Sequence, residues 1–490
     1  MWTEIATWLG VAFIAADWLL RVALAARVIM RDSTVAVTLS WLLLLVLVPI
    51  PFVPSAIYLL VGEPRLGLRR AERHARLSSR VENEAVVHWR KQRLDWTSDD
   101  PGYRPLSRLA TSMAGMPALR GNDVELLGTG GPVLDRLIAD IDGAKHHCHL
   151  LFYIWMPANK GLAVCEALIR AAQRGVQCRV LVDAVGSKQF LRHEVVPRMR
   201  RAGVQVVGAL PVNPFRMLLA RIDLRNHRKV TVIDGMAAYC GSQNLTDETF
   251  RIKRKAKVGP WIDSTVRVRG PAVQALQTVF LRDWAMEAGE ELPDLGPYFP
   301  RESEELVGQC VVHVMATGPG GQPDAIHSAM LAMLFGAQQE IIMTTPYFVP
   351  DEATKAALIN AAWRGVDVTL VLPDVLDAKL VAAAARSHFG DLMGAGVRIV
   401  LHPHGLLHAK TATIDRRLAM VGSANFDMRS FWLNFECTLF IYDEGFAKQL
   451  RFMQKHFEAE GRQISPSRWG QRPFRHRFID QCAQLFSPLL

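Results

Sequence analysis

Cysteines are few in this chain, and they show no pairing pattern. Among 490 residues there are 7 cysteines, an odd number, and no two are spaced as a CxxC pair. This argues against a disulfide framework and a zinc ribbon, and it is typical of a reducing, cytoplasmic-side environment. Charged residues are also few, at 21% against 50% hydrophobic residues, which excludes a disordered chain.

Negative charge is in the minority. The 57 lysines and arginines exceed the 47 acidic residues, which gives a formal net charge of +10. This surplus indicates an anionic partner, either nucleic acid, a phosphate ester or an anionic membrane, and composition does not choose among them. A mean hydropathy of +0.11 excludes membrane spans along the whole chain. At about 150 residues per domain, the length allows roughly three structural units.

Much of the apolar excess lies in residues 1–61. The segments 5–30 and 35–61 are each long enough to cross about 30 Å of hydrocarbon, so we predict a transmembrane helical hairpin. Asp17 and Arg21 are four residues apart and can neutralise each other on one helix face. The alternative is one span preceded by an interfacial helix. A cleaved signal peptide is disfavoured, because the chain has no basic n-region.

Prolines and then arginines mark the end of this region. Pro49, Pro51 and Pro54 should bend or break the second span. Six arginines follow within about 20 residues, and the positive-inside rule places them in the cytoplasm, where they can attract anionic lipid head groups. We interpret residues 62–120 as a basic juxtamembrane linker. These arginines are Arg65, Arg69, Arg70, Arg73, Arg76 and Arg80.

The rest of the chain contains an internal duplication. The string ALIRAAQRGV at 167–176 recurs as ALINAAWRGV at 357–366, and a β-branched apolar run follows each copy. Helix and strand patterns alternate in both halves, as in an α/β fold. A period of about 190 residues is too long for a solenoid. We predict two pseudo-symmetric α/β/α halves, residues 121–300 and 301–490.

Each half carries the same polar motif, HxKxxxxD, followed after six residues by GSxN. Two copies with identical spacing, at matching places of a duplication, are much more specific than one. The candidate catalytic residues are His227, Lys229, Asp234, His408, Lys410 and Asp415. The candidate phosphate-binding or supporting residues are Ser242, Asn244, Ser423 and Asn425.

These residue types suit phosphoryl chemistry. Residues i and i+2 of a strand point to one side, so His227 and Lys229 share a face, as do their counterparts. Such a cationic concavity fits a phosphate and stabilises charge in its transition state. Two histidines allow one to attack phosphorus while the other protonates the leaving alcohol and then deprotonates the incoming one. Asp234 and Asp415 lie at strand ends, where we expect them to bond turn backbone.

A nucleophilic imidazole needs its other nitrogen held, commonly by a carboxylate. Asp263 and Glu436 lie at equivalent places of the two halves, each just before a strand. We predict that these two carboxylates orient the two histidines.

The doubled motif resembles that of the phospholipase D superfamily. Further strings are similar to its membrane-anchored bacterial cardiolipin synthases: GEPRLG at 62–67, FYIW at 152–155, TPYFVP at 345–350 and GSANFDMRSFWLNFE at 422–436. The resemblance covers nearly the whole chain. It implies two phospholipase D-like halves that convert two phosphatidylglycerol molecules into cardiolipin and glycerol. It also implies that His227 is the nucleophile that forms a phosphohistidine, with His408 as acid and base.

The resemblance further implies that no cofactor and no metal take part. The cluster of His146, His147, Cys148 and His149 could otherwise suggest a metal site. The implied partners are phosphatidylglycerol and anionic membrane lipids, not nucleic acid, and a homo-oligomer stays open. The implied location is the bacterial inner (cytoplasmic) membrane, multi-pass, with the catalytic part on the cytoplasmic side.

Three other activities stay open. A membrane-anchored phospholipase D that uses water as acceptor would share every catalytic residue. Phosphatidylethanolamine could replace phosphatidylglycerol as donor. A membrane-tethered nuclease would use the positive charge, but the basic cluster lies beside the membrane segment and not in an aromatic-lined groove.

One insertion distinguishes the halves. The chain from Gly203 to His227 is 12 residues longer than that from Gly396 to His408. Its apolar and basic segment 214–221 is either an amphipathic piece that enters the membrane beside the site or an ordinary packed helix.

Overall fold

The computed structural model describes residues 2–31, 35–62, 72–73, 81, 92–94, 103–212, 223–246, 258–290, 292, 294–301, 306–319, 322, 324–485 and 487. The chain divides into two compact units. We call Met1–Arg69 with Val212–Leu224 the helical unit, and Arg70–Pro211 with Arg225–Leu490 the sheet unit. Most of the predicted linker, and the whole segment 214–221, lie outside the described residues.

The helical unit contains α1 (Trp2–Ile29), α2 (Val35–Leu47) and α3 (Val53–Val61). Among the described residues, α1 is the one helix long and apolar enough to cross a membrane, with 28 residues and a mean hydropathy of 1.8 over its apolar window. The second predicted span is not one helix, because it breaks between α2 and α3 where its prolines lie. Proline cannot donate a helical hydrogen bond and clashes with the preceding turn, so this break is the one predicted.

The charged residues of α1 form the predicted pair. Arg21 Nε lies 2.8 Å from Asp17 Oδ2, and both side chains are buried. The Arg21 guanidinium also donates to three backbone carbonyls, at 2.6 to 3.0 Å, which belong to Leu45, Val48 and Ile50. The two side chains therefore neutralise each other, and Arg21 also binds the backbone at and just after the end of α2.

The first half of the sheet unit follows α5 (Arg104–Ala114). Its strands are β1 (Leu119–Gly128), β2 (His147–Phe152), β3 (Gln177–Asp183), β4 (Gln205–Ala209), β5 (Val230–Ile233), β6 (Ala237–Gly241), β7 (Trp261–Ile262) and β8 (Thr265–Arg269). Its helices are α6 (Gly131–Gly143), α7 (Asn159–Gln173), α8 (Lys188–Leu191), α9 (Val195–Arg201) and α10 (Ala272–Ala288).

The second half repeats this order. Its strands are β9 (Cys310–Thr317), β10 (Glu340–Thr344), β11 (Phe348–Val349), β12 (Asp367–Pro373), β13 (Arg398–His402), β14 (Leu406–Leu407), β15 (Thr411–Ile414), β16 (Leu418–Gly422), β17 (Phe426–Asp427), β18 (Glu436–Tyr442) and β19 (Arg462–Gln463). Its helices are α11 (Ala325–Gly336), α12 (Glu352–Trp363), α13 (Lys379–Gly394), α14 (Met428–Trp432), α15 (Glu444–Glu460), α16 (Pro466–Gly470) and α17 (Phe474–Gln484).

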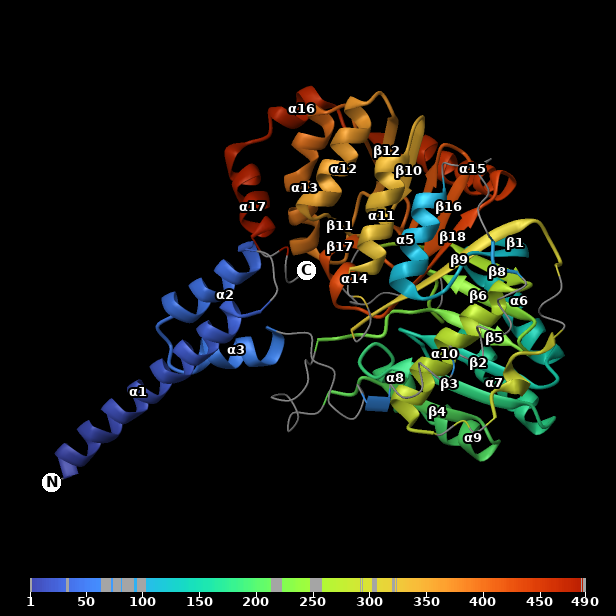
Figure 1. Ribbon diagram of the computed structural model, residues 1–490, viewed down its shortest axis with the longest axis horizontal. Helices are drawn as coiled ribbons and strands as arrows, with labels where there is room; N and C mark the ends of the chain where they lie inside the picture. The colour runs from blue at the N-terminus through green and yellow to red at the C-terminus, as the bar shows by residue number, and fades with distance from the viewer. Residues whose placement is uncertain are drawn as a thin grey trace. The chain divides into compact units, whose positions relative to one another are not determined.

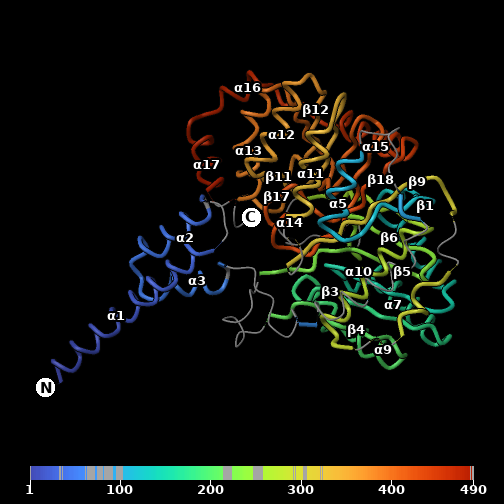
Figure 2. The backbone as a smooth tube through the Cα atoms, in the orientation of Figure 1, coloured from blue at the N-terminus to red at the C-terminus, as the bar shows by residue number. Residues whose placement is uncertain are grey.

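Both halves build one 15-stranded sheet. The first runs β1-β8-β6-β5-β2-β3-β4, and the second runs β9-β18-β16-β15-β10-β12-β13, with β19 at its edge. Equivalent strands thus take equivalent places, and the antiparallel pair of β1 and β9 joins the halves. Figures 1 and 2 show the cyan-to-yellow first half and the yellow-to-red second half of the sheet unit, with helices outside the strands. The predicted duplicated α/β architecture is confirmed.

One hydrophobic core crosses the junction. Phe280 and Trp284 of α10 pack in the same buried cluster as Leu439 of β18 and Phe446 of α15. The central strands are buried on both faces, so β5 and β15 are rich in β-branched residues and contain no charged side chain. The two halves are therefore parts of one folded unit.

Two short crossings link the motif of each half to the opposite half. β14 pairs in parallel with β7, and in the equivalent place Asn226 forms an isolated parallel bridge with Phe435. The backbone N–H of His227 donates to Phe435 O at 2.9 Å, and that of His408 donates to Ile262 O at 2.7 Å. The backbone of each motif histidine therefore lies beside a short extended segment of the other half.

Candidate active site

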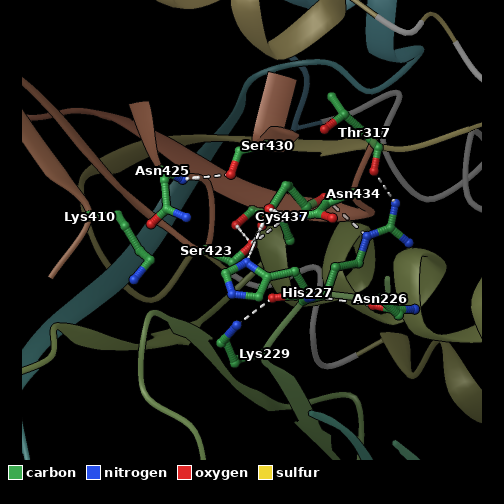
Figure 3. A network of polar contacts seen from close by, with 12 residues as sticks. Asn226, His227, Lys229, Thr317, Lys410, Ser423, Asn425, Ser430, Asn434 and Cys437 are labelled. Atoms are coloured by element: carbon green, nitrogen blue, oxygen red, sulfur yellow. Dashed lines mark hydrogen bonds and ion pairs between the residues drawn. The ribbon is translucent and has the colours of Figure 1, made fainter. Parts of the chain in front are cut away.

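His227 is held by a carboxylate of the second half. Its Nδ1 lies 3.0 Å from both Oε1 and Oε2 of Glu436. Ser423 Oγ and Asn434 Nδ2 also donate to this carboxylate, and Figure 3 shows them converging beside the imidazole. Because Glu436 can only accept when ionised, Nδ1 carries the proton and Nε2 keeps the lone pair.

His408 is held in the same way by a carboxylate of the first half. Its Nδ1 lies 2.6 Å from Asp263 Oδ1, to which Ser242 Oγ also donates at 2.7 Å. The structure thus brings both predicted carboxylates onto the motif histidines, and each comes from the opposite half. The crossings β7–β14 and Asn226–Phe435 cause this exchange, because Asp263 and Glu436 directly follow the paired residues.

The two motif lysines lie in the same buried site. Lys229 Nζ donates to His227 O at 2.6 Å, and Lys410 Nζ donates to His408 O at 2.7 Å. Figure 3 shows both lysines around the His227 ring. Burial lowers the pKa of Lys229 to about 8 and that of Lys410 well below its usual range. Each ammonium has two further N–H groups beyond its backbone bond, so together they can bind an anion.

Burial also keeps both imidazoles neutral. It lowers the pKa of His227 to about 4, although Glu436 opposes this shift, and it lowers the pKa of His408 to about 3. Lys410 contributes to the shift of His227 and Lys229 to that of His408, so the two motif copies lie within electrostatic reach of each other. At neutral pH both rings therefore present an unprotonated Nε2.

The carboxylates stay ionised in spite of their burial. Desolvation raises the pKa of Glu436 and of Asp263, but the neighbouring histidine, lysine and serine groups outweigh it, so both pKa values are lowered. Two buried negative charges therefore stand against two buried ammonium groups. The attraction between these opposite charges offsets part of the desolvation cost of burying them in a low-dielectric interior.

The aspartates of the motif contact backbone. Asp234 accepts three N–H groups, from residues 145, 146 and 147, at 2.7 to 2.8 Å. Asp415 accepts three from residues 338, 339 and 340, at 2.7 to 2.9 Å. Each lies at the far end of its strand from the motif histidine and binds backbone there, as expected from the sequence. These contacts indicate a structural role, although the motif placed both residues among the catalytic candidates.

The GSxN residues divide by role. The hydroxyls of Ser242 and Ser423 donate to the two carboxylates and accept from the backbone N–H groups of Ser264 and Cys437, so they support the carboxylates and are not free to bind phosphate. Asn244 Oδ1 accepts from Ile154 N at 3.0 Å. Within the described residues, the buried Nδ2 of Asn244 and the buried Oδ1 of Asn425 have no hydrogen-bond partner.

Two aromatic rings against the histidines were not singled out from the sequence. The Tyr153 ring lies 5.0 Å from that of His227, and Lys229 Nζ lies 5.3 Å from its centre. The Trp261 ring lies 4.3 Å from that of His408. These rings shield the imidazoles from water. Their positions carried a signal, since Tyr153 stands in the FYIW string and Trp261 two residues before Asp263.

Arg228, between the first histidine and lysine, is also a support missed from the sequence. It is buried, forms an ion pair with Asp283 of α10, and donates to Glu436 O at 3.0 Å and Thr317 O at 2.8 Å. It thereby fixes the segment that carries the carboxylate of His227. The second motif has Ala409 at this place, so this anchor belongs to one half.

The histidine cluster at the start of β2 contributes to packing. His147 Nε2 and His149 Nδ1 both contact Gln277 of α10, at 3.2 and 3.3 Å. The described residues contain no group of three or more His, Cys, Asp or Glu side chains placed to hold a metal ion.

Comparison with known proteins identifies the family of this chain. The family model described as "Cardiolipin synthase, PLD-like domain" matches residues 137–284 and 330–459, one block in each half. Cardiolipin synthase A of Serratia proteamaculans (strain 568) is 40% identical over 477 residues, which cover 96% of this chain and 97% of the relative. This chain belongs to the cardiolipin synthases. Cardiolipin synthase A of Yersinia pseudotuberculosis serotype O:1b (strain IP 31758) is also 40% identical, over 481 residues and with the same coverage.

A cardiolipin synthase is a phosphatidyltransferase, so the predicted function and enzyme class are confirmed. The fold has a solved counterpart in phosphatidylserine synthase of Haemophilus influenzae Rd KW20, with a TM-score of 0.58. The match covers 79% of this chain and 100% of that one, at 14% sequence identity. At this identity the likeness concerns the fold alone.

Proposed function

We propose that this cardiolipin synthase joins two phosphatidylglycerol molecules through a phosphohistidine on His227. The observation that carries the proposal is the pair of neutral, carboxylate-held imidazoles, one from each motif, in one site with both motif lysines. His227 Nε2 attacks the phosphorus of the first lipid. The P–N bond forms as the P–O bond to glycerol breaks, and His408 gives a proton to the departing glycerol oxygen.

The second step reverses the proton transfers. His408 takes the proton from a glycerol hydroxyl of the second phosphatidylglycerol, whose oxygen attacks phosphorus. The P–N bond then breaks, cardiolipin forms, and His227 regains its lone pair.

The bound phosphodiester itself prepares His408 to act as an acid. In the empty site, burial lowers the pKa of His408 to about 3. A phosphodiester anion between the lysines favours the protonated imidazole and so raises this pKa. The first lipid therefore supplies the charge that allows His408 to hold a proton.

The remaining polar groups have separate tasks in this scheme. Lys229, Lys410 and the unpaired amide donor of Asn244 bind the phosphate oxygens and stabilise the charge of the transition state. Asp263 and Glu436 are positioning residues, because they act through the histidines. Ser242, Ser423, Asn425 and Asn434 support this set.

Purified protein with labelled phosphatidylglycerol, alone and with phosphatidylethanolamine, tests the reaction. Cardiolipin and glycerol from phosphatidylglycerol alone are expected. Phosphatidic acid as the main product would indicate hydrolysis, and a need for phosphatidylethanolamine would change the donor. Acid-quenched protein should carry the phosphatidyl label, and His227→Ala should abolish it. Loss of the label in His408→Ala but not in His227→Ala would reverse the two roles.

We also propose that the protein lies in the bacterial inner membrane with the sheet unit on the cytoplasmic side. Helix α1 supports a membrane position, since its 28 residues extend about 42 Å. The arginine-rich sequence after residue 62 and the seven free cysteines support the cytoplasmic side. Protease added to intact spheroplasts should leave the sheet unit whole and should digest it once the membrane is opened.

A further inference from the structure

Helix α17 presents apolar side chains outward. Phe474 and Phe478 lie on one face of the helix, and Leu485, the residue that caps its C-terminal end, continues that face; they are 79%, 58% and 79% exposed. The opposite face carries Asp480 and Ala483, which are buried. Figure 1 shows α17 beside α13, against which it packs. The exposed strip offers roughly 400 Å² of apolar surface, which is within the range of the largest patch on a monomeric protein.

Positive charge flanks this strip. Arg475 and Arg477 lie on its two sides, about 100° and 60° around the helix from Phe474. The segment 468–477 contains four arginines and no carboxylate. Asp480 does not offset the strip, because it forms ion pairs with Arg386 and Arg472.

We propose that α17 lies in the interface of an anionic membrane and seats the sheet unit on the lipid surface. An apolar strip with arginines on both sides is the pattern of a helix that buries one face among acyl chains and binds lipid phosphates with its flanks. A second copy of the chain fits this face less well, because a two-fold contact would bring the arginines of one strip against those of the other. This surface is separate from the histidine site, so its failure would leave the proposed chemistry intact.

A label at the strip tests the proposal in the full chain. Phe478→Cys in a Cys482→Ala background is labelled with an environment-sensitive fluorophore and reconstituted in nanodiscs of phosphatidylglycerol and phosphatidylcholine. The matched control is Phe452→Cys in the same background, because Phe452 is 80% exposed on α15. Brominated acyl chains should quench the label at 478 severalfold more than the label at 452. In nanodiscs of phosphatidylcholine alone, the quenching at 478 should be weaker. Equal quenching at both positions would overturn the proposal.

Activity gives a second readout. The double substitution Phe474→Ser and Phe478→Ser should lower turnover on phosphatidylglycerol vesicles about tenfold, but less than about twofold in detergent micelles, where no surface has to be bound. Phe452→Ser should change neither. Equal loss in vesicles and micelles would show a folding effect instead. A dimer that the double substitution dissociates would identify a second copy as the occupant, and either result overturns the proposal.

A different observation, in the helical unit, concerns topology. Asp17 Oδ1 accepts the backbone N–H of Phe52 at 2.7 Å, and Arg21 binds carbonyls just before it, so the turn between α2 and α3 lies beside the middle of α1. Arg31, after the end of α1, donates to Gly62 O after the end of α3. Because α2 also begins just after Arg31, both ends of the α2–α3 hairpin lie at the C-terminal end of α1.

We infer that α2 and α3 form a re-entrant hairpin, which enters and leaves the membrane on one side while α1 crosses it. With 13 and 9 residues, α2 and α3 extend about 20 and 14 Å, short of the roughly 30 Å of hydrocarbon. Non-helical backbone at membrane depth needs protein partners, and Asp17 and Arg21 supply them at the turn. The N-terminus and residue 62 then lie on opposite sides, whereas two complete spans would place them on the same side.

Epitope tags at both ends of the full chain test this topology. In intact spheroplasts, protease should remove one tag and spare the other until the membrane is opened, and inverted vesicles should show the opposite pattern. The tagged protein must still make cardiolipin, which confirms insertion. Equal protection of both tags would establish two complete spans and overturn the inference.

Discussion

Removing the charge of Glu436 tests how the site prepares His227. Glu436→Gln keeps the size of the side chain, but no negative charge then faces Nδ1, which lies 3.0 Å from the wild-type carboxylate. Attack of Nε2 on phosphorus places positive charge on the imidazole. Opposite charges about 4 Å apart interact by about 4 kcal/mol at an effective dielectric constant of about 20. Loss of this interaction corresponds to a roughly thousandfold slower attack.

Rapid acid quench with labelled phosphatidylglycerol measures this step directly, as the rate at which label appears on the protein. The matched control is Glu444→Gln, which removes an exposed carboxylate that pairs with Lys448 on α15. We expect the control to form the adduct within about twofold of the wild-type rate, because a surface pair contributes little. The KM should change little in both variants, since Glu436 touches the histidine and not the lipid.

Two results would refute this reasoning. Adduct formation within about tenfold of wild type, with an unchanged Tm, would show that the Glu436 charge does not act on the attack. If Glu436→Gln slowed only the second step and Asp263→Asn only the first, His227 and His408 would exchange roles.

Three further outcomes follow from the supports and the buried charges. Asp415→Ala leaves three backbone N–H groups without their acceptor, so unfolding in denaturant should show a loss of about 2–4 kcal/mol, and a variant as stable as wild type would contradict its structural role. Arg228→Met leaves the buried Asp283 without its ion-pair partner and should lower the free energy of unfolding by about 3–5 kcal/mol. Adding Asp283→Leu should restore most of this loss, and no recovery would argue against the ion pair as its cause. Because the pKa values of His227 and His408 lie at about 4 and about 3 when folded and near 6.5 when unfolded, the unfolded chain binds more protons between these values. The Tm should therefore fall as pH drops from about 6.5 to 4, and it should fall less steeply in a His227→Gln variant. A flat Tm over this window in wild type would contradict the burial of both histidines in the neutral form.

The candidate site was predictable where its pattern is local. The apolar, β-branched runs after the two copies of the repeated string coincide with β3 and β12, because strand preference acts over a few residues. The doubled spacing located both histidine–lysine pairs and both carboxylates. The roles of Ser242 and Ser423 were not predictable to this degree, because a hydroxyl can serve a substrate or a neighbouring carboxylate, and only the three-dimensional arrangement decides which.

The helical unit shows the same division. Composition placed the apolar segments at residues 5–30 and 35–61, and the prolines located the break between α2 and α3. The path of the second segment depends on contacts of Asp17 and Arg21 with residues up to 35 positions away, which no hydropathy window contains.

By itself, the sequence determined the duplication, the α/β class, the two motif copies and the carboxylates that complete them, because each is a matter of spacing and residue type. Only the tertiary structure decided that Glu436 serves His227 and Asp263 serves His408. Those contacts join residues 209 and 145 positions apart, and they arise because β14 pairs with β7 and Asn226 with Phe435 across the junction. Each half thus completes the histidine of the other, so the site exists only when both halves share one sheet.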